Sequence, residues 1–466
     1  MQNTLESHHS QGLRKDALPF SETLAQSIAN IAPTATPAVN LGFVFAASLG
    51  GTWFTYLVAT IGLLLISVCI SQFAKRSATP GSLYAYVSEG LGPGAGFAVG
   101  WALILAYLTT GIAVIAGVGV YANDLLKASG IPISPYIVYG ACALGVFLIA
   151  YKDVSVSARV MLAIEGASVT FIFIVALLAM SHKGFDASQL HLEGLTGNGL
   201  RTGLVLAIFS FVGFESATAM GGEAQNPLKN VPRSVYLSTA ISGTFFVIMS
   251  LVMVSAFRGG AYPEAPLLGL GAVTGIPALG IICSLFAMVS LFACALASLT
   301  AVSRIVLAMG RDRLLHVSMG ATHAKNETPH MASGAGALLM FLVPSIMNIR
   351  GVPIGDVYGL NGTIATYGFL VAYICIAVAA VVFLAKIKQS SPLITTAAVV
   401  GTGMMGVAVY GSVIPYQEAP YGWLPIVFAI YMTVGAVCWM LSRPGVKAAA
   451  ADKASRLVRE SELETA

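Results

Sequence analysis

The sequence predicts an all-α membrane protein with twelve transmembrane helices, in which two inverted halves of five helices are followed by two more. Three observations support this fold class. Of the 466 residues, 57% are hydrophobic and only 9% are charged, whereas about 25% are charged in soluble domains. Apolar runs of about 20 residues, the length that crosses a bilayer, recur along the whole chain. Two of these runs, at corresponding places in the two halves, contain residues that interrupt helices.

Each apolar run can be placed to within a few residues. The third and eighth runs are the longest, at about 30 residues, and are therefore expected to form tilted helices. The twelve expected spans are 24–48, 52–74, 94–124, 135–151, 156–181, 203–221, 233–257, 276–308, 331–349, 361–385, 392–414 and 423–441.

These spans divide the chain into five segments. The first inverted repeat is expected over 21–185, the second over 200–388, and the last two spans over 389–442. Polar tails cover 1–20 and 443–466. The first tail has no apolar segment of the kind found in cleavable signal peptides, so the first span is expected to direct insertion.

Lys and Arg residues predict the orientation, because they are enriched in cytoplasmic connections. With the N-terminus inside, the great majority of the 24 Lys and Arg residues lie on the inner side. We therefore expect a multi-pass protein of the plasma membrane with both termini in the cytoplasm. The residues left on the outer side are Lys127, Lys183, Arg201, Arg258 and Arg350.

The first interruption lies within the first span, where Pro33 and Pro37 are four residues apart. Each proline removes a backbone donor and clashes with the preceding turn, so a continuous helix through 31–37 is not expected. The alternative is a kinked structural helix whose polar groups are satisfied by neighbouring helices.

The second interruption lies within the sixth span. Glu215 occupies the middle of an apolar segment, where a carboxylate is costly unless it faces protein or water. Gly213, with phenylalanines on both sides, marks a place where the helix can break and expose peptide groups to a cavity. The alternative is again a kinked helix, with Glu215 satisfied by backbone N–H groups. Since the first and sixth spans each open a group of five, the pair of breaks is typical of an inverted-repeat secondary transporter with its substrate site between them.

Three segments resemble the amino acid–polyamine–organocation transporter superfamily, and in particular its bacterial-type amino acid permeases. FSFVGFES (209–216) with GGEAQNPLKNVPRSV (221–235) resembles the sixth-helix signature. ATPGSLYAYVSEGLGPGAGFAVGW (78–101) resembles the entry to the third helix, and SRIVLAMGRDRLL (303–315) resembles the end of the eighth. The resemblance implies a LeuT-like fold and the uptake or exchange of amino acids or amines.

The resemblance also implies a substrate site built from both interruptions. Phe209 falls where the family has an aromatic lid, and Glu215 falls on the family's sixth-helix glutamate. The expected substrate-binding residues are Ile31, Ala32, Thr34, Ala35, Thr36, Ala38, Thr110, Phe209, Ser210, Phe211, Gly213 and Ser298.

The first interruption departs from the family pattern, which is usually rich in glycine. Prolines supply no N–H groups, so fewer donors can meet a substrate carboxylate. The hydroxyl groups of Thr34 and Thr36, together with the amides of Thr34, Ala35, Thr36 and Ala38, can still do so, assisted by the positive end of the following half-helix. This departure leaves room for an amine as the substrate.

Coupling to an ion gradient is expected, because the sequence has no phosphate-binding loop for a nucleotide. Glu165, in an apolar run of the fifth span, is the preferred proton carrier and Glu215 a second candidate, since burial favours the uncharged form of a carboxyl group. Glu165 could instead be held permanently in one state by hydrogen bonds. Sodium coupling through Ser298, Thr300 and Ser303 is the alternative. No cofactor or metal is expected.

The preferred hypothesis is proton-coupled transport of a small neutral amino acid. The alternatives are an amine or polyamine carrier, or an amino acid exchanger of the same superfamily. A membrane-embedded enzyme would need clustered His, Asp or Cys residues at one depth, and the sequence shows none. A channel leaves the matching interruptions unexplained, and a nutrient receptor of transporter shape would differ in showing no flux.

Overall fold

The computed structural model describes residues 12–128, 134–152, 154–263, 265–414 and 419–442. Apart from one β-bridge between Leu18 and Ala224, the regular structure of these residues is helical. Most of the two predicted polar tails, at residues 1–11 and 443–466, lies outside the described residues.

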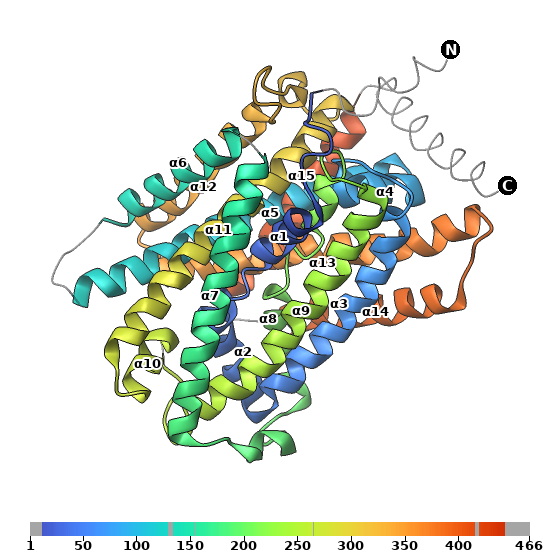
Figure 1. Cartoon of the computed structure of the whole chain (residues 1–466). Helices are drawn as coiled ribbons and strands as arrows, with labels where there is room; N and C mark the ends of the chain where they lie inside the picture. The colour runs from blue at the N-terminus through green and yellow to red at the C-terminus, as the bar shows by residue number, and fades with distance from the viewer. Residues whose placement is uncertain (1–11, 129–133, 153, 264, 415–418, 443–466) are drawn as a thin grey trace, which may run out of the picture.

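The helices run in chain order through a single bundle (Figure 1). They are α1 (Phe20–Ile31), α2 (Leu41–Ser48), α3 (Thr52–Ala74), α4 (Ser82–Leu91), α5 (Pro93–Ala128), α6 (Pro135–Lys152), α7 (Val154–Lys183), α8 (Gly197–Phe209), α9 (Pro227–Ala256), α10 (Pro266–Val273), α11 (Pro277–Arg311), α12 (His330–Ile349), α13 (Ile354–Lys386), α14 (Pro392–Val413) and α15 (Leu424–Leu441). Short π and 3₁₀ segments include η3 (Thr36–Asn40) and η6 (Ser216–Met220).

Ten helical stretches among the described residues are long and apolar enough to cross a membrane. This count differs from the twelve predicted spans for two reasons. Phe20–Ala74 counts as one stretch of 55 residues, although it contains both the first and second predicted spans. The sixth predicted span is divided between α8, which has only 13 residues, and η6. The chain is thus an all-helical, multi-pass membrane protein, while the twelve-span count and the inverted repeat stay predictions.

The first predicted interruption is present and is caused by its prolines. Helix α1 ends at Ile31, and Ala32 takes a left-handed conformation with φ 47°. The chain resumes as the π-helix η3, which contains Pro37 at its second position. A π-turn is a common way to accommodate a local break in the α-helical hydrogen-bond ladder.

The sequence predicted that the third and eighth spans are the longest, but the helix lengths do not set these two spans apart. Helices α5 and α11 have 36 and 35 residues, but α13 is nearly as long, with 33. The tenth span was predicted to begin at residue 361, whereas α13 begins at Ile354. Gly355, Asp356 and Gly359 lie in the first two turns of this helix, and their low hydropathy kept these turns out of the predicted apolar span.

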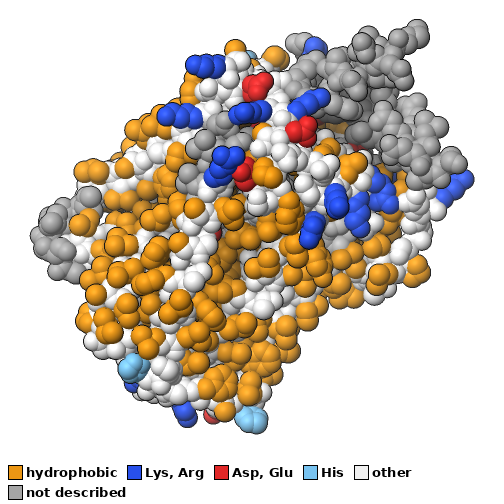
Figure 2. Space-filling view, viewed as in Figure 1, with side chains coloured by type: hydrophobic (Ala, Val, Ile, Leu, Met, Phe, Trp, Pro, Cys, Tyr) orange, Lys and Arg blue, Asp and Glu red, His pale blue; other side chains and the backbone are white. Residues whose placement is uncertain are grey.

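Helix α1 lies near the middle of the bundle, where it contacts α7, α9 and α11 (Figure 1). Helix α5 packs along both α11 and α13, and α3 packs along α9. Helix α15 is peripheral, with 11% of its membrane-spanning window buried. The face in Figure 2 carries a broad hydrophobic belt, with Lys and Arg side chains concentrated towards its upper end. This distribution is what a bilayer requires of a multi-pass protein.

A buried ion pair fixes the segment after η6 against α11. Arg304 Nε and Nη2 donate to the two carboxylate oxygens of Glu223, at 2.5 and 3.0 Å. Both side chains are almost fully enclosed, with exposures of 2% for Arg304 and 0% for Glu223. The Leu18 N–H donates to the Glu223 carbonyl at 3.1 Å, so the segment before α1 is tied to the same place. Nearby, the Tyr84 hydroxyl donates to Asp312 at 2.7 Å.

Arg304→Gln is expected to lower the free energy of unfolding by about 3–5 kcal/mol, because it leaves the Glu223 carboxylate buried without a counter-charge. The measurement is thermal and denaturant unfolding of the purified protein in detergent. The double variant Glu223→Gln, Arg304→Gln is expected to lose clearly less stability than the single variant. A single variant as stable as the double one would contradict this account.

Candidate functional site

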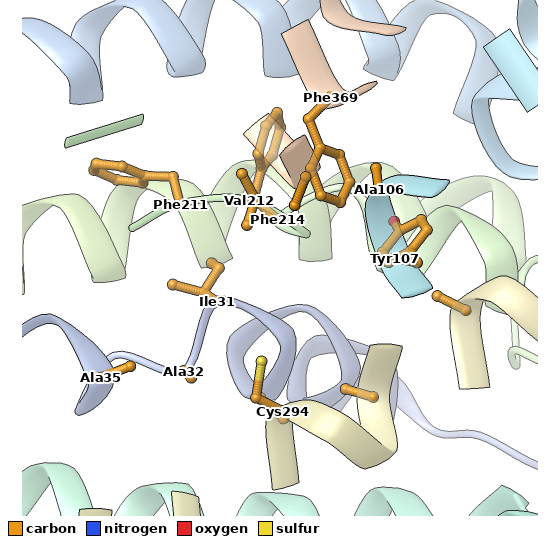
Figure 3. Packing of buried hydrophobic residues seen from close by; sticks show 14 of the residues in the cluster. Ile31, Ala32, Ala35, Ala106, Tyr107, Phe211, Val212, Phe214, Cys294 and Phe369 are labelled. Carbon is orange, nitrogen blue, oxygen red and sulfur yellow. The ribbon is translucent and has the colours of Figure 1, made fainter. Parts of the chain in front are cut away.

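The two interruptions lie against each other in the middle of the bundle. The Ala217 N–H donates to Ser27 Oγ at 3.0 Å, and the Ser216 hydroxyl donates to the Gln26 carbonyl at 3.2 Å. Figure 3 shows Ile31, the last residue of α1, lying between the first interruption and the stretch that contains Val212. Segments about 190 residues apart in the sequence therefore share one site.

Asn30 occupies the centre of this site. Its Oδ1 accepts a hydrogen bond from the Ser298 hydroxyl at 2.7 Å, and its backbone carbonyl accepts one from the Cys294 thiol at 3.2 Å. Its amide group fills the space where Gly213 has no side chain, so any Cβ at that position would overlap it. Asn30 Nδ2 is buried and has no hydrogen-bond partner among the described residues.

The first interruption offers hydroxyl groups, while two of its four expected amide donors bond to the chain itself. The Ala35 N–H donates to the Ala32 carbonyl at 2.8 Å, and the Ala38 N–H donates to the Thr34 carbonyl at 3.2 Å. These two of the four expected amide donors are therefore occupied by the chain itself. By contrast, Thr34 Oγ1 and Thr36 Oγ1 are buried without a partner among the described residues. Unpaired buried polar atoms are rare and costly, so they indicate a place for a ligand or water.

Tyrosines surround the segment that follows the first interruption. The Tyr121 hydroxyl donates to the Ala38 carbonyl at 2.7 Å, and the Tyr358 hydroxyl donates to Asn40 Oδ1 at 2.8 Å. The Tyr262 hydroxyl is buried and has no partner within the described part of the chain. These residues come from α5, α13 and the connection before α10, so several elements close the site together.

The second interruption begins where α8 ends at Phe209. Gly213 has φ 90°, a conformation that L-residues with side chains rarely adopt. The hydroxyls of Ser210 and Tyr56 lie 3.2 Å apart. Phe211 is fully buried and makes an edge contact with Phe246, with ring centroids 4.8 Å apart. Ser210 and Gly213 therefore lie at the site, whereas Phe211 points into the core.

Glu215 is held by two tyrosines. The Tyr107 hydroxyl donates to its Oε1 at 2.6 Å, and the Tyr373 hydroxyl donates to its Oε2 at 2.7 Å. These are short hydrogen bonds to a carboxylate, which are stronger than bonds between neutral groups. Because Tyr107 belongs to α5 and Tyr373 to α13, Glu215 ties the second interruption to two long helices. This geometry favours a positioning role for Glu215 over direct contact with a substrate amine.

Glu165 is also buried but only half satisfied. The Ser290 hydroxyl donates to its Oε1 at 2.5 Å, while Oε2 has no partner among the described residues. Ser290 lies one turn of α11 before Cys294, which bonds to Asn30. The Ser290 hydroxyl, the Cys294 thiol and Asn30 therefore lie one after another between Glu165 and the first interruption.

A cavity of about 280 Å³ lies beside the end of α8, where the second interruption begins, and reaches Asn40 at the end of η3. Phe209 lines it and makes an edge contact with Tyr358, with ring centroids 6.1 Å apart. Among the described residues that line it, none is charged. The lining residues are Asn40, Phe43, Thr202, Val205, Leu206, Phe209, Tyr358, Gly359, Thr363, Thr366, Tyr367, Gly411, Ser412 and Tyr421.

The structure does not bring Thr110 to this group through any hydrogen bond. The Thr110 hydroxyl donates to the Ala106 carbonyl of its own helix at 2.8 Å. Of the alternative sodium ligands, the Ser303 hydroxyl donates to the Leu299 carbonyl. Arg304 Nη1 donates to the Thr300 carbonyl at 3.0 Å, whereas the Thr300 hydroxyl is buried without a partner among the described residues. Ser298 contacts the site through Asn30.

Sequence reasoning missed Asn30, Tyr107, Tyr373 and Ser290. Asn30 had a usable signal, since it is a polar amide in an apolar run immediately before a helix break. The tyrosines had none, because nothing in their spacing identifies a partner more than 100 residues away.

The profile of the amino acid permease family matches residues 22–448. The branched-chain amino acid permease BcaP of Bacillus subtilis is 26% identical over 362 residues, which cover 72% of this chain and 74% of the permease. The mitochondrial cationic amino acid transporter 3 of Arabidopsis thaliana is 24% identical over 64% of this chain and 52% of its own length. The low-affinity putrescine importer PlaP of Escherichia coli is 25% identical over 61% of this chain and 65% of its own. The chain spans about half the length of the cationic amino acid transporters that it matches.

Gly213→Ala is expected to lower stability by about 2 kcal/mol or more, because its Cβ would overlap the Asn30 amide in a strained backbone conformation. The measurement is the melting temperature in detergent. Gly166→Ala is the matched control, since a Cβ at Gly166 meets open space. Equal melting temperatures for the two variants would contradict the close contact between Asn30 and Gly213.

Proposed function

The chain belongs to the amino acid permease family, and on that basis we propose that it is a secondary active transporter of a small neutral amino acid. The observation that carries this proposal is a set of three buried polar atoms at the first interruption that have no partner among the described residues: Asn30 Nδ2, Thr34 Oγ1 and Thr36 Oγ1. Desolvated donors and acceptors of this kind gain their lost hydrogen bonds when a small polar substrate binds. The proposed substrate site comprises these three residues with Ile31, Ser210, Gly213, Ser298 and the aromatic ring of Phe209.

We propose twelve spans in this membrane fold, with α1–α2 and α8–η6 as the first helices of two inverted five-helix repeats. The two discontinuous segments then occupy equivalent places around the site, as in transporters built from inverted repeats. The Lys and Arg distribution favours cytoplasmic termini in a plasma membrane.

The proposed orientation makes this structure open to the outside and closed to the inside. Thr202, Thr363 and Tyr421 of the cavity follow connections on the proposed outer side. The Glu223–Arg304 pair lies on the proposed inner side, where it ties the segment after η6 to α11. Alternating access would break this pair and close Phe209 over the substrate.

The amino acid and amine hypotheses differ in the charge that the site must meet. The described residues that line the cavity include no carboxylate, and both oxygens of Glu215 already accept hydrogen bonds. These two observations favour a substrate without net positive charge. The amine alternative is supported by the two occupied amides at the first interruption and by the likeness to a putrescine importer. An exchanger of the same superfamily would use the same site without net coupling.

A substrate panel separates these possibilities. In proteoliposome counterflow, labelled alanine or serine is expected to be exchanged, with saturation, and putrescine is expected to compete poorly. Asn30→Ala is expected to lower uptake at least tenfold, since the site loses a central donor. Uptake of putrescine but not of alanine, serine or γ-aminobutyrate would favour the amine carrier, and absence of any saturable flux would overturn the proposal.

Glu165 is proposed to couple transport to protons, since one of its oxygens is buried and has no partner in the described part of the chain. Glu165→Gln is expected to abolish the acceleration of uptake by an inward proton gradient while retaining substrate binding. Uptake is measured across external pH values with and without sodium. The control Ser290→Ala removes only the hydroxyl donor to Glu165, and it should shift the pH profile without removing it. Full pH dependence in Glu165→Gln, or an absolute need for sodium, would refute proton coupling through this residue.

A further inference from the structure

A groove of about 450 Å³ lies between α3 and α9, away from the proposed substrate site. It forms where α3 ends and α9 begins. One turn or more further into the bundle, the hydroxyls of Ser67 on α3 and Thr239 on α9 lie 3.0 Å apart and hold the two helices together. The groove opens beyond this contact, towards the charged end of the pair.

The rim of the groove is basic. Lys75 from α3 lines it together with Lys229 and Arg233 from α9, and the described lining residues include no Asp or Glu. All three side chains are exposed. Within the described residues, none of the three takes part in an ion pair. The Arg233 guanidinium lies over the Phe20 ring, 4.8 Å from its centroid, so one cation is held at the groove wall.

The floor of the groove and the adjoining surface combine polar and apolar side chains, as contact with a lipid requires. Ser71 and Gln72 add polar groups to the lining, while Leu228 and Tyr236, each 46% exposed, provide apolar surface beside the cations. The same pair of helices continues into the hydrophobic belt with exposed Ile241. Figure 2 shows Lys and Arg side chains bordering this belt at the upper ends of α3 and α9.

We propose that this groove binds the headgroup of an anionic phospholipid, with the lipid chains lying along α3 and α9. The three cations surround a site of headgroup size at the boundary of the apolar belt, which is where a bilayer phosphate lies. Basic pockets between transmembrane helices are suited to such headgroups, and the attraction grows with each Lys or Arg near the surface. A phosphatidylglycerol headgroup supplies the negative charge that the groove lacks. The proposal rests on the membrane spans and not on the identity of the transported substrate.

The test counts lipids bound to the purified full-length protein by native mass spectrometry. The wild-type protein is expected to retain phosphatidylglycerol in preference to phosphatidylcholine. The variant Lys75→Gln, Lys229→Gln, Arg233→Gln is expected to weaken phosphatidylglycerol binding on the order of a hundredfold. The matched control, Lys152→Gln, Arg313→Gln, Lys325→Gln, removes three exposed cations elsewhere and is expected to bind as the wild type does.

Three outcomes would overturn the proposal. Equal losses in the two triple variants would mean that overall charge, not the groove, attracts the lipid. Equally tight phosphatidylcholine binding would mean that the apolar surface alone is responsible, and displacement by millimolar inorganic phosphate would indicate a site for free phosphate. If the groove triple variant does not fold, Lys229→Glu replaces it, with Lys325→Glu as its control. Lys229→Glu alone is then expected to weaken phosphatidylglycerol binding more than tenfold, and an unchanged affinity would overturn the proposal.

Discussion

The structure depends on one constraint: peptide and side-chain polar groups that leave a helix inside a membrane must find partners within the protein. The chain breaks two helices and then meets this requirement by placing the breaks against each other. Ser27 and Gln26 of α1 satisfy groups on η6, and Tyr121 satisfies the carbonyl of Ala38. Three buried polar atoms at the first break, on Asn30, Thr34 and Thr36, have no partner among the described residues, which is why that place is suited to a polar substrate.

Three buried glutamates show three solutions to the cost of an acid in a low-dielectric interior. Glu223 is neutralised by Arg304, and Glu215 accepts hydrogen bonds from two tyrosine hydroxyls. Glu165 has one serine donor and one oxygen without a partner among the described residues. The first two are satisfied and therefore fix elements in place, whereas the third has an oxygen left over, which is why it is the proposed proton carrier. All three side chains are buried, so the depth of burial does not distinguish them. They differ in the number of partners that each carboxyl group has.

The two proposed binding surfaces of the bundle differ in character. The site between the interruptions is enclosed, uncharged along its approach and formed by residues distant in sequence. The groove between α3 and α9 is open, basic and placed at the edge of the apolar belt. A charge is tolerated in the groove because water and headgroups screen it, but within the bundle an unpaired charge would carry a large desolvation cost.

The sequence alone determined the class of protein and the places where its helices break. Composition required membrane helices, Pro33 and Pro37 required an end to α1, and Gly213 supplied the only backbone at that point able to turn with positive φ beside Asn30. These are local effects of hydropathy and backbone sterics, so they can be recognised without a fold. Glu165 and Glu215 were recognisable for the same reason, as carboxylates within apolar runs. The partners were decided only by tertiary structure: Tyr107 and Tyr373 for Glu215, Ser290 for Glu165, and Ser298 for Asn30. A hydrogen bond between distant helices depends on which of their faces pack together. Neither hydropathy nor spacing along the chain predicts that packing.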